Sequence, residues 1–326
     1  MRRCLSRALV ASILVLASSI SASAGERYAL IVSGASGGPP YLEQYSRWAN
    51  ELSRVLRERM KFVPGNVVVL EEAGQGANSA TAANVRRAMS AFRPRMTSND
   101  LLLVVLIGHG TFDGADAKFN LVGPDLESAD WAALFNGLAS RLIVVNTASA
   151  AFPFLERLAG PRRVVISATD GAAQRFDTVF PEFFIHALED SAADIDKNGR
   201  VSIWEAFAAT TASVRRYYQQ QGTLATERGL LDDNGDGVGH ESVGSSDDGK
   251  TASSIYLDEP TPGAPPTDEV LVQLLQQKSA LATEAEELKI RRQFLPPADY
   301  QKEFERIMVA LARVERDIRV RRGGSN

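Results

Sequence analysis

The sequence predicts an α/β protein in which a mostly parallel sheet is flanked by helices, with an α-helical hairpin near the C-terminal end. Short apolar runs rich in β-branched residues alternate with amphipathic stretches of helical spacing. Continuous apolar runs are typical of strands buried on both faces of a sheet. Strands that alternate with helices in this way predict parallel pairing with helices on both sides. Beyond a polar segment, leucines recur at heptad spacing, which predicts two paired helices.

Five apolar runs are expected to form the strands of this sheet. Each is short, carries few charges and is rich in valine, leucine and isoleucine, which favours a strand over a buried helix. In chain order they are Arg27–Ser33, Asn66–Glu71, Leu101–Ile107, Arg141–Asn146 and Arg163–Ala168.

Amphipathic stretches between and after these runs are expected to be the covering helices. Their apolar residues recur at intervals of three and four, as on one face of a helix. Together with the strands they place one α/β domain at residues 25–243. The expected helices are Tyr41–Met60, Ala80–Met96, Trp131–Leu138, Pro181–Asp190 and Ile203–Gln220.

The C-terminal part of the chain is expected to be a linker followed by a helical hairpin. Residues 244–267 are rich in Ser, Asp, Gly, Thr and Pro, which is typical of a linker. Residues 268–322 contain two stretches with a coiled-coil seam. The hairpin either folds on itself or on the α/β domain, or it associates with a second copy or docks a protein partner. The seam residues are Leu274, Leu281 and Leu288, then Phe304, Ile307, Leu311, Val314 and Ile318.

Residues 1–24 have the pattern of a secretory signal. Arginines near the start precede the apolar stretch Ala8–Ile20, and Ala22-Ser23-Ala24 is a small-residue cleavage site before Gly25. The alternative is a membrane anchor, but the apolar stretch is short for a bilayer span. No later stretch is long and apolar enough to span, so we expect no stable membrane span after cleavage and a periplasmic or extracellular location.

The composition further narrows the classes of function. The chain has 36 lysines and arginines against 40 acidic residues, and the signal contains three of the arginines. This acidic balance, without a basic cluster, argues against a nucleic-acid-binding protein. The one cysteine, Cys4, lies inside the expected signal, so the processed chain would have no disulfide and no thiol.

The segment Asp194–Glu205 (DIDKNGRVSIWE) has the pattern of an EF-hand calcium loop. Ca²⁺ takes six to eight oxygen ligands, which a twelve-residue loop supplies from positions 1, 3, 5, 7, 9 and 12. Gly199 stands at position 6, where the chain turns sharply, and helix-like sequence flanks the loop on both sides. The ligands are expected to be the side chains of Asp194, Asp196, Asn198, Ser202 and Glu205 and the backbone carbonyl of Arg200.

A second stretch, Asp232–Gly237 (DDNGDG), begins a loop of the same kind. Position 12 of that loop is Val243, which has no ligand atom, and Glu241 stands two residues early. Three interpretations are open: a half-site, a donor of oxygens to the first ion, or a turn rich in Asp and Gly. The candidate ligands are Asp232, Asn234 and Asp236.

His109 stands between two glycines directly after the expected strand Leu101–Ile107, and the next long strand ends in Asn146-Thr147-Ala148-Ser149. In open α/β sheets, ligands bind in the crevice at the carboxyl ends of the strands. Adjacent parallel strands would bring these two ends together. A general base on one strand end and a nucleophile on the next is the arrangement of a Cys/His hydrolase.

This strand order resembles the caspase and legumain group of cysteine peptidases over roughly residues 27–239. The likeness includes His109-Gly110 closing one strand and Val145–Ala148 closing the next. Arg163–Thr169 and Val179–Leu188 also fit later elements of that family. In the family the second strand ends in an acidic residue, a small residue and the catalytic cysteine, commonly followed by a Ser-Gly turn. The resemblance therefore implies a caspase-like fold and a catalytic dyad at these strand ends.

The chain departs from the family at the position of the nucleophile. Laid onto this sequence, the catalytic cysteine falls on Ala148 and the acidic residue on Asn146, whereas the histidine carries over to His109. Alanine cannot attack a carbonyl carbon. Ser149 is the neighbouring candidate nucleophile, although successive side chains of an extended strand face opposite ways. His109 is then either the remnant of a catalytic base or the base of a Ser149 hydrolase.

From these residues we expect an exported, calcium-binding pseudopeptidase that acts as a binding or scaffold module. Peptides or proteins are the expected partners, through the cleft at the strand ends or through residues 268–322. The alternative is an active hydrolase or peptidase that uses Ser149 with His109.

Overall fold

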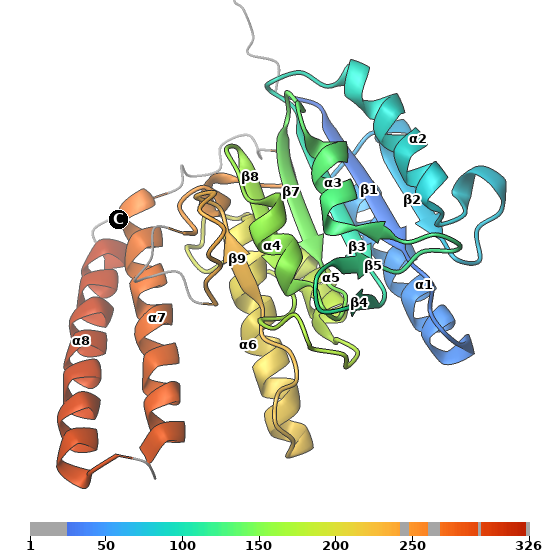
Figure 1. Ribbon diagram of the computed structural model, residues 1–326. Coiled ribbons are helices and arrows are strands. Elements are labelled where there is room, and N and C mark those ends of the chain that lie inside the picture. Colours follow the sequence, from blue (N-terminus) through green and yellow to red (C-terminus); the bar gives the residue numbers. More distant parts are fainter. Residues whose placement is uncertain (1–24, 242–247, 260–267, 293–294, 324–326) are drawn as a thin grey trace, which may run out of the picture.

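A computed structural model describes residues 25–241, 248–259, 268–292 and 295–323. The expected signal at residues 1–24 lies outside the described residues, as do parts of the expected linker. Figure 1 shows a central sheet with helices on both faces and a pair of long helices beside it. The predicted fold class, an α/β protein with a mostly parallel sheet and a C-terminal helix pair, is confirmed.

The central sheet has six strands in the order β2-β1-β3-β7-β8-β9. The first five pair in parallel, and β9 pairs antiparallel with β8. The five predicted strands are found to within one residue, because each is a continuous apolar run buried in the sheet. The strands are β1 (Arg27–Ser33), β2 (Val67–Glu71), β3 (Leu101–Ile107), β7 (Arg141–Asn146), β8 (Arg163–Ser167) and β9 (Leu230–Asp232).

Helices cover the two faces of the sheet in two groups, each with its own buried core. The first core lies under α1 (Pro39–Arg54), α5 (Phe180–Glu189) and α6 (Ile203–Gln221). The second lies under α2 (Ala82–Phe92), α3 (Ser128–Phe135) and α4 (Phe152–Leu158). The predicted α1 and α2 stretches run on into a π-helical turn at Val55–Arg59 and a 3₁₀ turn at Arg93–Arg95.

The sequence patterns missed several short elements. A small antiparallel sheet follows β3, and α4 follows the end of β7. Strands of two or three residues contain too little alternation to be recognised, and a seven-residue helix contains too few turns. The small sheet consists of β4 (Gly110–Phe112), β5 (Ala117–Phe119) and β6 (Leu126–Glu127).

The expected linker is in part a packed segment of the α/β domain. Within residues 248–259, Ala252, Ile255 and Leu257 are buried in the first core, and the carboxylate of Asp248 accepts the backbone N–H of Asp233 at 3.0 Å. The prediction of a linker is therefore wrong for this stretch. Its polar composition is misleading because a few well-spaced apolar residues are enough to anchor it.

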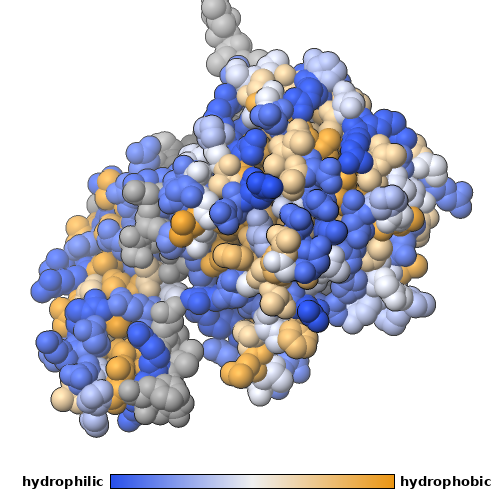
Figure 2. Space-filling model, in the orientation of Figure 1, coloured by the Kyte–Doolittle hydropathy of each residue, from blue (hydrophilic) through white to orange (hydrophobic). Residues whose placement is uncertain are grey.

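The hairpin consists of α7 (Glu269–Arg291) and α8 (Pro297–Gly323). Leu271, Leu275 and Ile318 are buried in the first core of the α/β domain, so that one end of the hairpin is docked. The other end has its own small cluster. In the space-filling view, hydrophobic and hydrophilic residues are mixed over the visible face of both the hairpin and the domain (Figure 2). Among the described residues no helix is long and apolar enough to cross a membrane.

Candidate functional site

The ends of β3 and β7 lie side by side, as the sequence predicted. The two strands pair in parallel, with Leu106 opposite Asn146. Beyond them, His109 and Ser149 line one cavity of about 480 Å³, together with Gln174 and Arg175 from the loop after β8. The predicted neighbours therefore meet at the carboxyl edge of the sheet.

Both ring nitrogens of His109 face oxygen atoms. Nε2 lies 2.8 Å from the carbonyl oxygen of Ser36, and Nδ1 lies 3.0 Å from Oδ1 of Asp177. Both nitrogens are thus engaged with oxygen atoms of the chain, and neither of them faces the hydroxyl of Ser149.

Two tyrosines of α1 hold the imidazole from the side. The rings of Tyr41 and Tyr45 meet His109 edge to face, with centroids 5.1 and 5.5 Å away. The hydroxyl of Tyr45 lies 3.3 Å from Nε2. Burial raises the pKa of Tyr45 well above its usual range, so this hydroxyl stays neutral at physiological pH. No sequence pattern indicates these partners, because they come from a distant segment of the chain.

Ala148, in the position expected for a nucleophile, is a core residue. It is 1% exposed and belongs to the second core, with Phe154 and Leu155 of α4. His109 contacts α1, which covers the other face of the sheet. The two positions implied by the family resemblance are thus neighbours in the sheet, but their surroundings belong to opposite faces.

The hydroxyl of Ser149 is bonded to the backbone rather than to the imidazole. It accepts from the N–H of Gly110 and donates to the carbonyl of Gly110, each at 3.1 Å. A Cβ on Gly110 would lie 2.1 Å from the Ser149 carbonyl oxygen, so this close approach requires glycine. Ser149 therefore joins the end of β7 to the segment after β3.

The turn that follows Ser149 contains a strained residue. Ala150 has φ 51°, a left-handed conformation that a residue with a Cβ rarely adopts. Its N–H donates to the carbonyl of Gln174 at 3.0 Å. The hydroxyl of Thr169 accepts the next two N–H groups, those of Ala151 and Phe152, at 3.1 and 3.2 Å. Thr169, which the sequence analysis did not single out, fixes this turn.

The loop Asp194–Glu205 lies between α5 and α6 and gathers its acidic side chains in one buried place. Carboxylate oxygens of Asp194, Asp196 and Glu205 lie within 4.8 Å of one another. All three residues are less than 10% exposed. Glu205 also forms a capping box with Ser202 at the start of α6, which fixes its position.

The electrostatics of this loop are unfavourable without a cation. Burial, followed by the charge of Glu205, raises the pKa of Asp196 to about 7. Burial likewise raises the pKa of Glu205. Carboxylates held together away from water disfavour one another's ionised form. The donor set consists of oxygens, which suits a hard divalent cation such as Ca²⁺ or Mg²⁺.

The other loop positions are arranged as an oxygen-ligand loop requires. Gly199 has φ 88°, which a glycine adopts without strain. The Arg200 side chain turns outward, pairs with Asp258 at 2.7 Å and lies 4.0 Å above the ring of Tyr256. Only the backbone of Arg200 is then left for the loop, as expected. The amide of Asn198 donates to the hydroxyl of Tyr256 at 2.8 Å, which ties the loop to the segment 248–259.

The second Asp-rich loop does not gather a comparable group of acids. The carboxylate of Asp232 accepts the backbone N–H groups of Gly235 and Gly237 at 2.7 and 2.8 Å, whereas Asn234 and Asp236 are exposed. Among the described residues, Asp194, Asp196 and Glu205 are the one acidic group close enough to share an ion. Position 12, Val243, lies outside the described residues. Glu241 pairs instead with Arg215 and Arg228, at 2.6 and 2.5 Å.

The other histidines lie away from both places. His186 is exposed on α5. Nδ1 of His240 lies 2.6 Å from Oδ2 of the buried Asp248.

Comparisons with known proteins leave the family open. No family model matches the chain, and no curated protein matches it. Among solved structures, protein GSU0716 from Geobacter sulfurreducens is similar, with 15% identity and a TM-score of 0.43. That similarity covers 64% of this chain and 92% of the other. A likeness at this level carries no argument about function.

Proposed function

We propose that this protein is an exported, calcium-binding protein with a caspase- or legumain-like domain that has no peptidase activity and acts as a binding or scaffold module. The observation that carries the proposal is the environment of His109. Both of its nitrogens face acceptors inside the chain, and Ala148 stands where the family has its nucleophile.

The surroundings of Ser149 and His109 support the absence of peptidase activity. A serine or cysteine becomes a nucleophile when an adjacent base accepts its proton. The hydroxyl of Ser149 donates to the carbonyl of Gly110, and the imidazole of His109 is bound by Asp177 and Ser36. Loss of the nucleophile in comparable machinery lowers turnover by about a millionfold. The same cleft can still hold a peptide, since its wall includes backbone groups, Phe112 and Arg175.

Calcium would stabilise the folded protein and would take no part in ligand binding at the cleft. It would be held by the side chains of the Asp194–Glu205 loop and the carbonyl of Arg200, and it supplies the positive charge that the buried carboxylates lack. Because the loop directly precedes α6, the ion would fix the start of that helix. Exported proteins meet calcium at concentrations that fill sites with Kd of roughly 10⁻⁴ to 10⁻³ M.

Labelling with a fluorophosphonate probe tests the absence of hydrolase activity. The wild-type protein and Ser149→Ala are compared, with Ser191→Ala as a control on an exposed serine. We expect no specific labelling of any of the three and no cleavage of a peptide mixture. Labelling that disappears only in Ser149→Ala would overturn the proposal and establish the alternative, a hydrolase with Ser149 and His109.

A further inference from the structure

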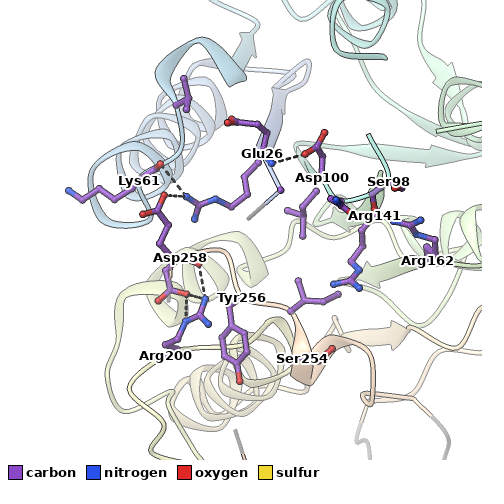
Figure 3. A pocket seen from close by; sticks show the side chains of 17 residues that line it. Glu26, Lys61, Ser98, Asp100, Arg141, Arg162, Arg200, Ser254, Tyr256 and Asp258 are labelled. Carbon is purple, nitrogen blue, oxygen red and sulfur yellow. Dashed lines mark hydrogen bonds and ion pairs between the residues drawn. The ribbon is translucent and has the colours of Figure 1, made fainter. Parts of the chain in front are cut away.

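A second cavity lies at the opposite edge of the sheet, where the parallel strands begin. Its volume is about 500 Å³, and its wall includes the starts of β1, β3 and β7 and the segment 254–259. Figure 3 shows Arg141 and Arg162 on one side of this cavity and Arg200, Tyr256 and Asp258 on the other. It is separate from the cleft at His109, and one of its lining residues, Arg200, belongs to the loop Asp194–Glu205.

The acidic side chains around this cavity already have partners within the chain. The contacts are Asp258 with Arg200 at 2.7 Å, Glu259 with Arg27 at 2.9 Å, Asp100 with the backbone N–H of Glu26 at 2.6 Å, and the Glu26 carboxylate with the amide of Asn66 at 3.1 Å. Within the part of the chain that the structure describes, none of these carboxylates forms an ion pair with Arg141 or Arg162 on the opposite wall.

Arg141, the first residue of β7, is a cation of this cavity for which no ion pair is found among the described residues. Among the residues that the structure describes, its guanidinium makes no hydrogen bond and no ion pair, although the residue is half-buried. Its side chain extends into the cavity (Figure 3). A half-buried guanidinium has five N–H donors, and an anion is the ligand that satisfies them best.

Arg162 stands beside Arg141, because Leu142 pairs with Arg163 across β7 and β8. Its guanidinium donates one hydrogen bond, to the carbonyl of Ser98. Several N–H donors of each arginine therefore remain for a ligand at this wall.

Arg162 has a backbone conformation that is unusual for a residue other than glycine. The N–H of Arg163 bonds to the carbonyl of Gly160 at 3.3 Å, which closes a turn with Pro161 and Arg162 at its centre. Arg162 has φ 61°, and proline fixes the preceding φ at a negative value, so this is a type II turn. Glycine is the residue that suits this position. A positive φ at a residue other than glycine persists only where the surrounding structure holds it, and such residues cluster at ligand sites.

We propose that this cavity binds a small oxyanion, the phosphate, sulfate or carboxylate group of a ligand, between the guanidiniums of Arg141 and Arg162. Two neighbouring guanidiniums can each direct paired N–H donors at such a group. Ser98 and Asn99 line the same wall and add polar groups to it.

Titration calorimetry of the full chain with inorganic phosphate, in calcium-free chloride buffer, tests this site. Arg141→Gln and Arg162→Gly are each expected to weaken phosphate binding by about tenfold or more, since each removes charged hydrogen bonds. Glycine relieves the positive φ at residue 162, so Arg162→Gly should weaken binding without lowering the melting temperature. Arg157→Gln, which removes the same charge from an exposed position on α4, should leave the affinity unchanged.

Two outcomes would overturn the proposal. The first is no heat of binding with phosphate, sulfate or citrate up to about 10 mM. The second is an equal loss of affinity in Arg157→Gln, which would show that the effect depends only on net charge. Parallel titrations with sulfate and with citrate identify the group that binds. A response to phosphate and sulfate assigns a tetrahedral anion, and a response to citrate alone assigns a carboxylate.

Discussion

The cleft at His109 and the loop Asp194–Glu205 differ in whether their polar groups have partners within the chain. In the cleft, the imidazole of His109 and the hydroxyl of Ser149 have partners inside the chain. In the loop, three carboxylates share a buried space small enough for one ion, and burial raises the pKa of Asp196 to about 7. Under our proposal a cation from outside balances the charge of the loop, whereas the polar groups of the cleft find their partners within the chain.

The difference shows that a residue pattern alone does not establish the chemistry that it suggests. A histidine at a strand end predicts a catalytic base, yet both ring nitrogens of His109 face oxygen atoms of the chain, which supports our proposal that it is a structural group. The acidic loop keeps the features that ion binding requires. Both observations support the proposal that the protein acts by binding.

The largest expected effect is that of calcium on thermal stability. An ion that binds the folded loop alone at about 100 times its Kd adds about 2.7 kcal/mol to the free energy of unfolding. For a domain of this size that corresponds to a rise of roughly 5–10 °C in melting temperature. Glu205→Gln should abolish the rise while retaining the capping box, since glutamine serves there too. Asp236→Asn in the second loop should keep it, and a rise lost equally in both variants would contradict the assignment.

Glu227 is a buried acid outside the loop Asp194–Glu205, and it shows what burial does to a carboxylate that has hydrogen-bond partners. Burial raises its pKa to about 7, although the N–H groups of Val179 and Phe180 and the hydroxyl of Tyr218 bind the carboxylate. The folded state therefore binds more protons than the unfolded state between about pH 4.5 and 7, and stability falls as pH rises through this window.

The expected loss through Glu227 is roughly 2–3 kcal/mol between pH 5 and 8, measured by urea unfolding in the presence of calcium. Glu227→Gln should flatten this dependence. An unchanged pH profile in Glu227→Gln would assign the dependence to other groups.

Gly110→Ala tests the close packing of the two strand ends. The added Cβ would lie 2.1 Å from the carbonyl oxygen of Ser149, so a backbone segment must shift. We expect a loss of about 2 kcal/mol in the free energy of unfolding, as for other overpacked sites. Gly65→Ala, where a Cβ meets nothing within 4 Å, is the matched control and should be nearly neutral. Equal stability of the two variants would show that the strand ends are loosely joined.

The smallest expected effect is that of Ser149→Ala. Removal of the hydroxyl leaves the backbone of Gly110 with two unmade hydrogen bonds, which costs about 1 kcal/mol. Denaturant melts would detect this loss against Ser191→Ala as reference. A serine that served catalysis alone would change activity and leave stability unaltered.

Much of the fold could be predicted because its strands are buried on both faces. Each strand is then a continuous apolar run with clear ends, such as Leu101–Ile107. The edge strand Leu230–Asp232 was missed because it is three residues long and leads into the Asp-rich loop. The composition of segment 248–259 predicts a linker because its polar residues outnumber the few apolar ones that anchor it.

The candidate sites could be predicted to the extent that their residues are close together in the sequence. The acidic loop is local, so its twelve residues contain the whole pattern, and its carboxylates do converge. The state of His109 depends on Ser36 and Asp177, which lie 73 and 68 positions away in the chain. Nothing in the sequence around His109 indicates these partners. The cavity at Arg141 is likewise assembled from segments scattered along the chain.

Calcium titration by calorimetry tests the central claim most directly, because it measures the need for a cation at the Asp194–Glu205 loop. The account predicts a binding heat with a stoichiometry of about one ion per chain in the wild-type protein and none in Glu205→Gln. Absence of heat in the wild-type protein at millimolar calcium, or an equal heat in Glu205→Gln, would contradict it.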